Sequence, residues 1–345
     1  MITSYHFADL EDGRPITAYK ITNRWGEYAV ILNYGAVIQS LVVKDRDGNL
    51  GDVVLGPDEG QAPGFMCRPA SVMGRAANRI AYGKFTIDGK EYQLKIARGE
   101  HHLHGNTGNY AGQFFDVTPG DDCVTLSLLD TGEDGWECTC DTHITYTFTD
   151  NHSLTIDYSI TAHGSTVICP TNHAYFNLDY PNEILDTKLK IFTDNYAPKS
   201  AIGMPDGRRA PVAGTPMDFS KGMTFAEGFA SDKIGFFPEG RLGYDDFFVL
   251  PDDGFRQVAE AVNPNSGRRM RVFSDAEGLT LFTPSGAFGP TPNKYGKILE
   301  GFTSFCLETQ YVPNAVNCEG YQSPVFRDGE TMHSTTVYAF DTVAK

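Results

Sequence analysis

The chain has 345 residues, of which 44 are Asp or Glu and 28 are Lys or Arg, so its formal net charge is −16. A surface with this excess of negative charge repels nucleic-acid phosphates and anionic lipids, so we expect no nucleic-acid partner and no membrane partner. The charge is compatible with a neutral small-molecule ligand. Hydrophobic residues make up 41% of the chain, which is enough for a sizeable core.

The N-terminal residues and the cysteines indicate a cytoplasmic protein. Residues 1–5 contain no basic region followed by an apolar run, as a secretory signal would. The sequence has no window of about 18 uncharged apolar residues, so no membrane span is expected. The seven cysteines are odd in number and lack the spacing of a secreted disulfide framework. We therefore expect the reducing environment of the cytoplasm.

Alternation of apolar and polar residues predicts β-strands along much of the chain. In chain order, this period of two covers residues 28–43 with a break at Gly35, then 124–128, 144–149 and 154–161. The last two segments flank Asp150 and Asn151, which suit a tight turn, so they predict a β-hairpin with one buried face. The glycines and prolines fall between such segments, which is typical of many short strands joined by turns.

Helical patterns are almost missing. Only residues 223–234 suit a short helix, and Gly228 weakens it. No glycine-rich phosphate loop follows a strand, which disfavours a nucleotide-binding α/β enzyme. An all-β sandwich or barrel is therefore the predicted fold class. A stretch rich in Gly and Pro at 202–216 is either a linker between two domains or an ordered loop, and composition does not decide between them.

Two polar segments occur in the first third of the chain. Residues 74–80 contain Asn78 and two arginines, whose amide and guanidinium groups can donate hydrogen bonds to hydroxyls or a carboxylate, although surface arginines are common. Further on, His102 and His104 would share one face of a strand, as the ligands of a metal-binding barrel of the cupin type do. No carboxylate follows this pair closely and the Cys138–Cys140 pair has no partner at zinc spacing, so we expect no metal site.

Two further segments contain candidate proton-transfer groups. His173 lies among aromatic residues in 170–178, where it is either a satisfied core histidine or a proton donor near neutral pH. Glu308 follows apolar residues in a predicted strand over 305–310. A carboxylate there is costly unless it is paired or functional, and the alternative is an outward-facing strand position.

Together these segments resemble the galactose mutarotase (aldose 1-epimerase) family nearly from end to end. The family's arginine, histidine, catalytic-acid and catalytic-base motifs resemble, in this order, residues 74–80, 103–105, 171–178 and 307–317. Weaker matches lie between them, at residues 214–219, 243–245 and 263–268.

The resemblance implies an all-β fold, a large antiparallel β-supersandwich with few short helices, formed by a single domain over residues 1–345. The stretch 202–216 is then a loop within that domain. The resemblance also implies an isomerase, an aldose 1-epimerase that interconverts the anomers of a free sugar such as galactose or glucose. Neither a cofactor nor a metal is implied, and the oligomeric state is not predicted.

The resemblance also assigns residue roles. Glu308 becomes the general base and His173 the general acid, and a carboxylate beside His173 would favour its charged form. Arg79 is preferred to Arg75 as a ligand contact, with Arg75 as support. The residues implied to contact the sugar are Asn78, Arg79, His104, Tyr175 and Asp245.

Two alternatives remain beside the enzyme. One is a catalytically silent carbohydrate-binding relative, which we would expect to lose Glu308 or His173 first; the other is the metal-dependent barrel. Three departures from the family pattern, at residues 280–285, Trp136 and Asn106, alter the expected rim of the sugar site. They leave open which of galactose, glucose, xylose or arabinose is preferred.

Overall fold

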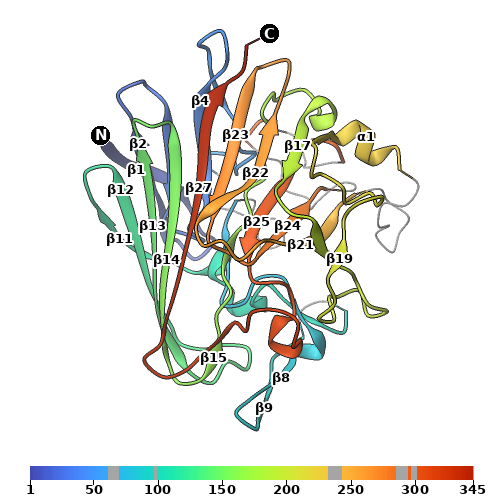
Figure 1. The fold of residues 1–345 in the computed structure, drawn as a ribbon. Helices are drawn as coiled ribbons and strands as arrows, with labels where there is room; N and C mark the ends of the chain where they lie inside the picture. The colour runs from blue at the N-terminus through green and yellow to red at the C-terminus, as the bar shows by residue number, and fades with distance from the viewer. Residues whose placement is uncertain (61–69, 97–98, 232–242, 285–293, 297–300, 345) are drawn as a thin grey trace.

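The computed structural model describes residues 1–60, 70–96, 99–231, 243–284, 294–296 and 301–344. In these residues strands predominate, as the sequence predicts, and they form three large antiparallel sheets (Figure 1). Three residues of the predicted helix, 232–234, and position 285 lie outside the described residues. No helix in the described part is long and apolar enough to span a membrane.

The largest sheet has nine strands and contains the predicted hairpin. In sheet order the strands are β11 (Asp116–Pro119), β12 (Cys123–Asp130), β13 (Thr139–Thr149), β14 (Ser153–His163), β27 (Thr331–Thr342), β23 (Arg268–Ser274), β22 (Arg256–Val262), β17 (Lys188–Ile191) and β20 (Met223–Thr224). The long strand β27 lies between β14 and β23 and so joins the hairpin to the later strands (Figure 1).

Two five-stranded sheets accompany it. The first is N-terminal and consists of β1 (Ile2–Asp9), β2 (Pro15–Thr22), β3 (Tyr28–Leu32), β4 (Ile38–Lys44) and β5 (Leu50–Asp52), in chain order. The other has the order β19 (Ala210–Pro211), β18 (Asn195–Ala197), β21 (Asp245–Val249), β24 (Gly278–Phe282) and β25 (Cys306–Gln310). We call it the β25 sheet, because its edge strand β25 contains Glu308.

Short pairs and turns complete the fold. The two-stranded pairs are β6 (Val72–Met73) with β16 (Thr171–Asn172), β7 (Arg79–Ile80) with β10 (His102–Leu103), β8 (Lys84–Ile87) with β9 (Lys90–Gln93), and β15 (Thr166–Val167) with β26 (Val325–Phe326). The described α-helix is α1 (Phe225–Phe229), and the 3₁₀ turns are η1 (Ala81–Gly83), η2 (Asn106–Gly108), η3 (Tyr110–Gly112), η4 (Ile184–Asp186) and η5 (Ala315–Asn317).

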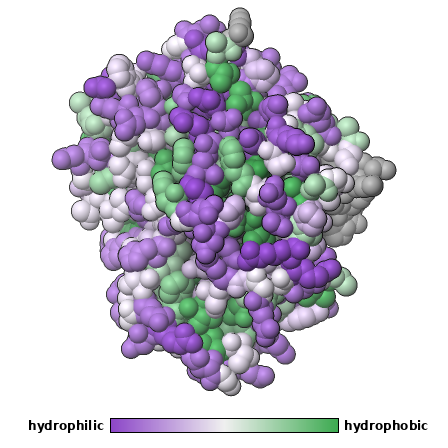
Figure 2. All heavy atoms as spheres, in the orientation of Figure 1, coloured by the Kyte–Doolittle hydropathy of each residue, from purple (hydrophilic) through white to green (hydrophobic). Residues whose placement is uncertain are grey.

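The hairpin of β13 and β14 has the predicted buried face. Ile144 pairs with Tyr158 and Tyr146 with Ile156, and all four side chains are buried, whereas the threonines that alternate with them are half-buried. One hydrophobic cluster takes side chains from all three large sheets. Burial of this shared apolar surface is the main contribution that holds the sheets together. On the outside, hydrophilic residues cover most of the face shown in Figure 2.

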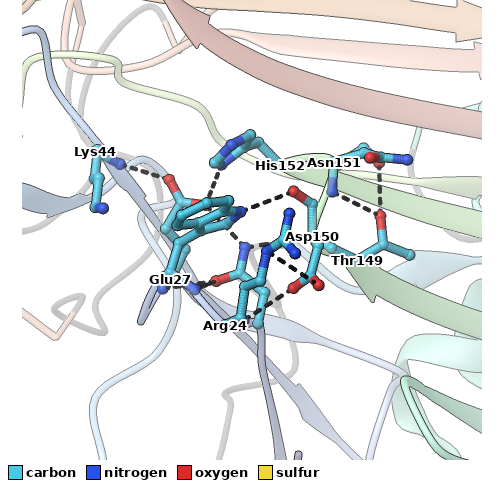
Figure 3. Close-up of polar contacts among 10 residues, drawn as sticks. Arg24, Glu27, Lys44, Thr149, Asp150, Asn151 and His152 are labelled. Atoms are coloured by element: carbon cyan, nitrogen blue, oxygen red, sulfur yellow. Dashed lines mark hydrogen bonds and ion pairs between the residues drawn. The ribbon is translucent and has the colours of Figure 1, made fainter.

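A polar junction links the N-terminal sheet to the hairpin (Figure 3). Glu27, just before β3, is only 2% exposed. Its Oε2 lies 2.5 Å from His152 Nδ1 in the hairpin turn, and its Oε1 accepts a hydrogen bond from the backbone N–H of Lys44 in β4. Because a buried carboxylate is costly without partners, these contacts fix the turn against the sheet.

Candidate active site

Glu308 and His173 lie in direct contact. Their Oε1 and Nε2 atoms are 3.4 Å apart, and their side chains are 2% and 8% exposed. The other nitrogen of His173, Nδ1, and the second oxygen of Glu308, Oε2, have no hydrogen-bond partner among the described residues. The fold therefore brings together two proton-transfer groups that are far apart in the sequence, each with a buried polar atom left unsatisfied.

Strand alternation explains the direction of Glu308. Its neighbours Leu307 and Thr309 face the core, where Thr309 Oγ1 lies 2.6 Å from Thr336 Oγ1 in β27 and Tyr338 donates to the carbonyl of Leu307. Because successive strand residues point to opposite faces, Glu308 points away from β27. Contacts on the side of β27 thus fix the strand β25, and the Glu308 carboxylate lies on the opposite face of the β25 sheet.

His173 is fixed by the pairing of β16 with β6. Its backbone N–H donates to the carbonyl of Ser71, and its own carbonyl accepts from Ala70. Two residues earlier, the Thr171 hydroxyl donates to the carbonyl of Thr309, at 2.9 Å. The segments that contain the acid and base candidates are therefore hydrogen-bonded to each other, which limits how far the imidazole can move from the carboxylate.

Burial governs the protonation of the pair. It lowers the pKa of His173 to about 4, against the opposite influence of the His173 backbone and of Asp245. Burial also raises the pKa of Glu308 well above its ordinary value; Asp245 raises it further and Arg79 lowers it. The charged form of His173 is therefore disfavoured in the sugar-free site, because desolvation outweighs the nearby carboxylate. One proton shared between the two groups is the state that burial favours.

Arg79 and Asp245 lie beside this pair and are only partly buried. Arg79 Nη1 lies 3.3 Å from Asp245 Oδ2 and 3.4 Å from Asn78 Oδ1, and the Arg79 and Asp245 side chains are 32% and 18% exposed. Asp245 begins β21 and pairs with Phe282 in β24, one strand away from β25. The site is therefore accessible to solvent from the side of the Arg79–Asp245 pair.

His104 is held by Asn78 through an unusual backbone shape. Both residues adopt positive φ, 53° and 56°, a region that Asn and His tolerate better than most residues. The Asn78 backbone N–H donates to His104 Nδ1 at 3.1 Å, so the neutral ring carries its proton on Nε2. Burial, with His173 next, lowers the pKa of His104 well below its ordinary value, which keeps the ring neutral.

The segments that bear Asn78 and His104 approach each other closely. Gly105 has a φ of 81°, and a Cβ added there would lie 2.0 Å from the carbonyl oxygen of Gly74. The next residue is Asn106, where the family resemblance led us to expect a second glycine. Its φ is 58°, which asparagine adopts more easily than other side chains do, so this departure keeps the local shape.

An aromatic wall lines the histidine side of the site. The Tyr175 ring stacks on that of His173, with centroids 5.0 Å apart, and Phe282 packs edge-on against His173 at 5.6 Å. The sequence indicated that the segment 280–285, which includes Phe282, alters the rim of the site, but it did not identify Phe282 as a residue that packs on His173. Phe282 could have been found from its position two residues after Thr280, because residues two apart in a strand lie on the same face. Thr280 pairs directly with Glu308.

Arg75 lies in the interior and not among the site groups. Its side chain is fully buried, with Nε 2.8 Å from Asp130 Oδ2, and it packs over the ring of Trp136. The His102 ring also packs against Trp136, and its Nδ1 lies 2.9 Å from the carbonyl oxygen of Lys95. His102 and His104 thus have different neighbours, and no group of three His, Cys, Asp or Glu in the described chain is arranged to hold a metal.

The family model for aldose 1-epimerase matches residues 17–339. The chain belongs to the aldose 1-epimerase family. It is 33% identical to the galactose mutarotase of Sus scrofa over 350 residues, covering 98% of both chains, and 28% identical to the aldose 1-epimerase of Escherichia coli K12 over 340 residues, covering 95% of this chain and 96% of that one.

Solved structures of this family share the fold. An aldose epimerase homologue from C. elegans aligns with a TM-score of 0.84 at 24% identity, over 94% of this chain and 98% of that one. A galactose 1-epimerase from Lactobacillus acidophilus aligns with a TM-score of 0.84 at 22% identity, over 100% of this chain and 99% of that one. The predicted all-β sandwich of the galactose mutarotase type is thereby confirmed.

Proposed function

We propose that this chain interconverts the α and β anomers of a free aldose, with Glu308 as general base and His173 as general acid. The contact of 3.4 Å between Glu308 Oε1 and His173 Nε2 is the observation that supports this assignment. The two oxygens that must exchange protons, the anomeric hydroxyl and the ring oxygen, are bonded to the same carbon. An acid and a base that lie close to each other can therefore reach both of them.

The reaction is a pair of proton transfers. Glu308 removes the proton of the anomeric hydroxyl while His173 delivers its proton to the ring oxygen, so the bond from the ring oxygen to the anomeric carbon breaks and an aldehyde forms. Rotation about the adjacent carbon–carbon bond turns the aldehyde over. The two groups then carry out the reverse proton transfers: Glu308 returns its proton to the carbonyl oxygen, and His173 takes the proton of the attacking hydroxyl. Closure of the ring gives the other anomer. No electrons are gained or lost overall, and both proton-transfer groups return to their starting state.

Family membership determines the class of enzyme. The chain is an aldose 1-epimerase, an isomerase, and its family acts on free sugars. The catalytically silent alternative is not favoured, since Glu308 and His173 are both present in contact. The metal-dependent barrel lacks support as well, because the fold is that of the galactose mutarotases.

Sugar contacts in this proposal come from the groups around the pair. Arg79, Asn78 and His104 supply donors, and the Asp245 carboxylate accepts from hydroxyls. Tyr175 supplies an apolar surface beside His173, on which a pyranose ring can lie. Several relatives are named galactose mutarotases, so galactose is the first sugar to test.

The same proposal extends to the whole chain. We take residues 1–345 as one domain, because a single cluster of buried side chains draws on all three large sheets. Within the stretch 202–216, the carbonyl of Arg208 accepts a hydrogen bond from Tyr321, as expected of a loop packed on that domain. The six described cysteines are free thiols, which suits a reducing cytoplasm.

The decay of optical rotation tests the activity. Freshly dissolved α-galactose, α-glucose, α-xylose and α-arabinose are each followed in a polarimeter with and without the protein. We expect the protein to accelerate the decay for at least one of them to the same final rotation, because an epimerase changes the rate and not the equilibrium. A decay that matches the uncatalysed one for every sugar would contradict the proposal.

A further inference from the structure

A pair of thiols lies beside the buried guanidinium of Arg75. Cys138 is half-buried and directly precedes β13, and its Sγ is 3.6 Å from Arg75 Nη1. The same nitrogen donates to Thr166 Oγ1 at 3.1 Å, and Nη2 donates to the Cys138 carbonyl at 2.8 Å. Cys138 is thus a half-buried cysteine whose sulfur has a fixed positive charge next to it.

Cys140 completes the pair from the inside. It is fully buried in β13 and lies two positions after Cys138, which is in the bend just before the strand. The two thiols are close enough for the protonation of each to affect that of the other. Residues two apart in an extended strand have Cα atoms near the upper end of the separation that a disulfide spans, roughly 6.8 Å. A disulfide between them therefore requires only a local bend.

The surroundings give the two thiols different pKa values. The neighbouring Cys140 thiol and the Arg75 charge lower the pKa of Cys138 to about 6, and burial opposes them. The pKa of Cys140 is raised by the neighbouring Cys138 thiol and by burial. The two other half-buried cysteines, Cys123 and Cys318, have pKa values raised by burial. Near neutral pH, Cys138 is therefore the thiolate of this set, with a protonated thiol beside it.

We propose that Cys138 and Cys140 form an oxidisable dithiol, in which Cys138 reacts with a peroxide and Cys140 captures the product as a disulfide. The Cys138 thiolate attacks one peroxide oxygen; its sulfur is oxidised by two electrons, the O–O bond breaks, and the second oxygen leaves as hydroxide and becomes water. The Cys140 sulfur then attacks the sulfenic acid. The S–O bond breaks, an S–S bond forms, and the hydroxyl leaves with the Cys140 proton as water.

The position of the dithiol connects it to the sugar site. Arg75 is held by Cys138 on one side and Asp130 on the other, and it begins the segment that leads to Asn78 and Arg79. Moving the Cys138 sulfur towards Cys140 removes one contact of Arg75. We expect the oxidised protein to have a raised KM for the aldose, and we expect reduction to restore it.

Alkylation rates test whether Cys138 is the reactive thiol. The folded protein is treated with limiting iodoacetamide at pH values from 5 to 9, and each cysteine is quantified by mass spectrometry. At pH 6 we expect Cys138 to react roughly tenfold faster than Cys123 and Cys318, after allowing for the lower nucleophilicity of an acidic thiol. Its rate should level off above about pH 7, while theirs keeps rising. Parallel profiles for all three cysteines would overturn the proposal.

Peroxide treatment tests the capture step. In the wild-type protein we expect the peptide containing residues 138–140 to lose two hydrogens, reversibly by a thiol reductant. Cys140→Ser should stop at a sulfenic acid that dimedone traps on Cys138, Cys138→Ser should give neither product, and the control Cys123→Ser should behave as wild type. If Cys140→Ser does not fold, the wild-type mass shift alone decides. Failure to form this disulfide, or first oxidation at Cys123 or Cys318, would overturn the proposal.

Discussion

His173 and Glu308 form a coupled pair in which burial and contact act together. Each group alone would titrate as a buried side chain, but at 3.4 Å the protonation of one depends on that of the other. In the proposed mechanism the two groups share one proton, and this proton moves to His173 when Glu308 is to act as base. Burial keeps water away from the charged forms of His173 and Glu308. The hydroxyls of a bound sugar can form hydrogen bonds to them in place of this water, which makes the proton transfer less costly. Activity therefore requires one proton on the pair, neither none nor two.

The pH dependence follows from this requirement. Because burial lowers the pKa of His173 to about 4, the pair gains its second proton only near that pH. We expect kcat/KM, measured by polarimetry, to stay nearly constant from pH 7 to pH 5. At pH values below about 4 it should decrease, because His173 and Glu308 are then both protonated. An acid limb centred near pH 6.5, the ordinary histidine value, would contradict this account.

Arg79 should act mainly on binding. Its planar guanidinium lies within reach of both Asn78 and Asp245, a geometry that lysine cannot reproduce. A lost hydrogen bond to a charged group costs about 1.5–3 kcal/mol, which is roughly a ten- to hundredfold change. We expect Arg79→Lys to raise KM by about that factor with a smaller effect on kcat. Arg14→Lys, an exposed arginine paired with Asp12, is the matched control. An unchanged KM would remove Arg79 from the sugar site.

At the scale of elements, the correct predictions came from the alternation of apolar and polar residues along the strands. The period of two predicted β13, β14 and the direction of their buried face, because side-chain alternation is a local property. The pairing of β25 with β24, which places Thr280 opposite Glu308, depends on contacts between distant segments and was not predicted. The positive φ of Asn78 and His104 was also not predicted, since neither residue requires it as glycine would.

The polar junction of Figure 3 yields a prediction about stability. Burial raises the pKa of Glu27, but hydrogen bonds from Asn23, His152 and the Lys44 backbone outweigh it and lower the pKa below the ordinary value. A group with a lowered folded pKa stabilises the fold above its unfolded pKa, and this contribution is lost as pH falls through the folded pKa. We expect Glu27→Gln to reduce the free energy of unfolding at pH 7 by about 1–3 kcal/mol.

Denaturant unfolding at pH 7 and pH 3 measures this effect. The variant and the wild type should differ less at pH 3, because the wild-type carboxylate is partly or fully protonated there. The exposed Glu11→Gln serves as a control and should match the wild type at both pH values. A difference between Glu27→Gln and wild type that is equal at the two pH values would show that the charge of Glu27 contributes nothing.

At the scale of the whole molecule, the site depends on how the sheets meet. The β25 sheet supplies Glu308 and Asp245, while β16 and β7, each in a short two-stranded pair, lead to His173 and carry Arg79. No single sheet contains the site, so its geometry depends on the shared core. Sequence motifs proposed the site residues through the family resemblance. Their contact distances and the aromatic wall required the structure.

The most direct test of the account is Glu308→Gln, compared with the exposed control Glu319→Gln. A positioned base contributes about 10²- to 10⁴-fold in rate, and glutamine keeps the shape of the side chain but cannot accept the proton. With the sugar that the wild type uses best, polarimetry should give a rate lower by at least about 10²-fold for Glu308→Gln, with sugar binding by calorimetry retained and Glu319→Gln fully active. Mutarotation by Glu308→Gln at close to the wild-type rate would contradict the account.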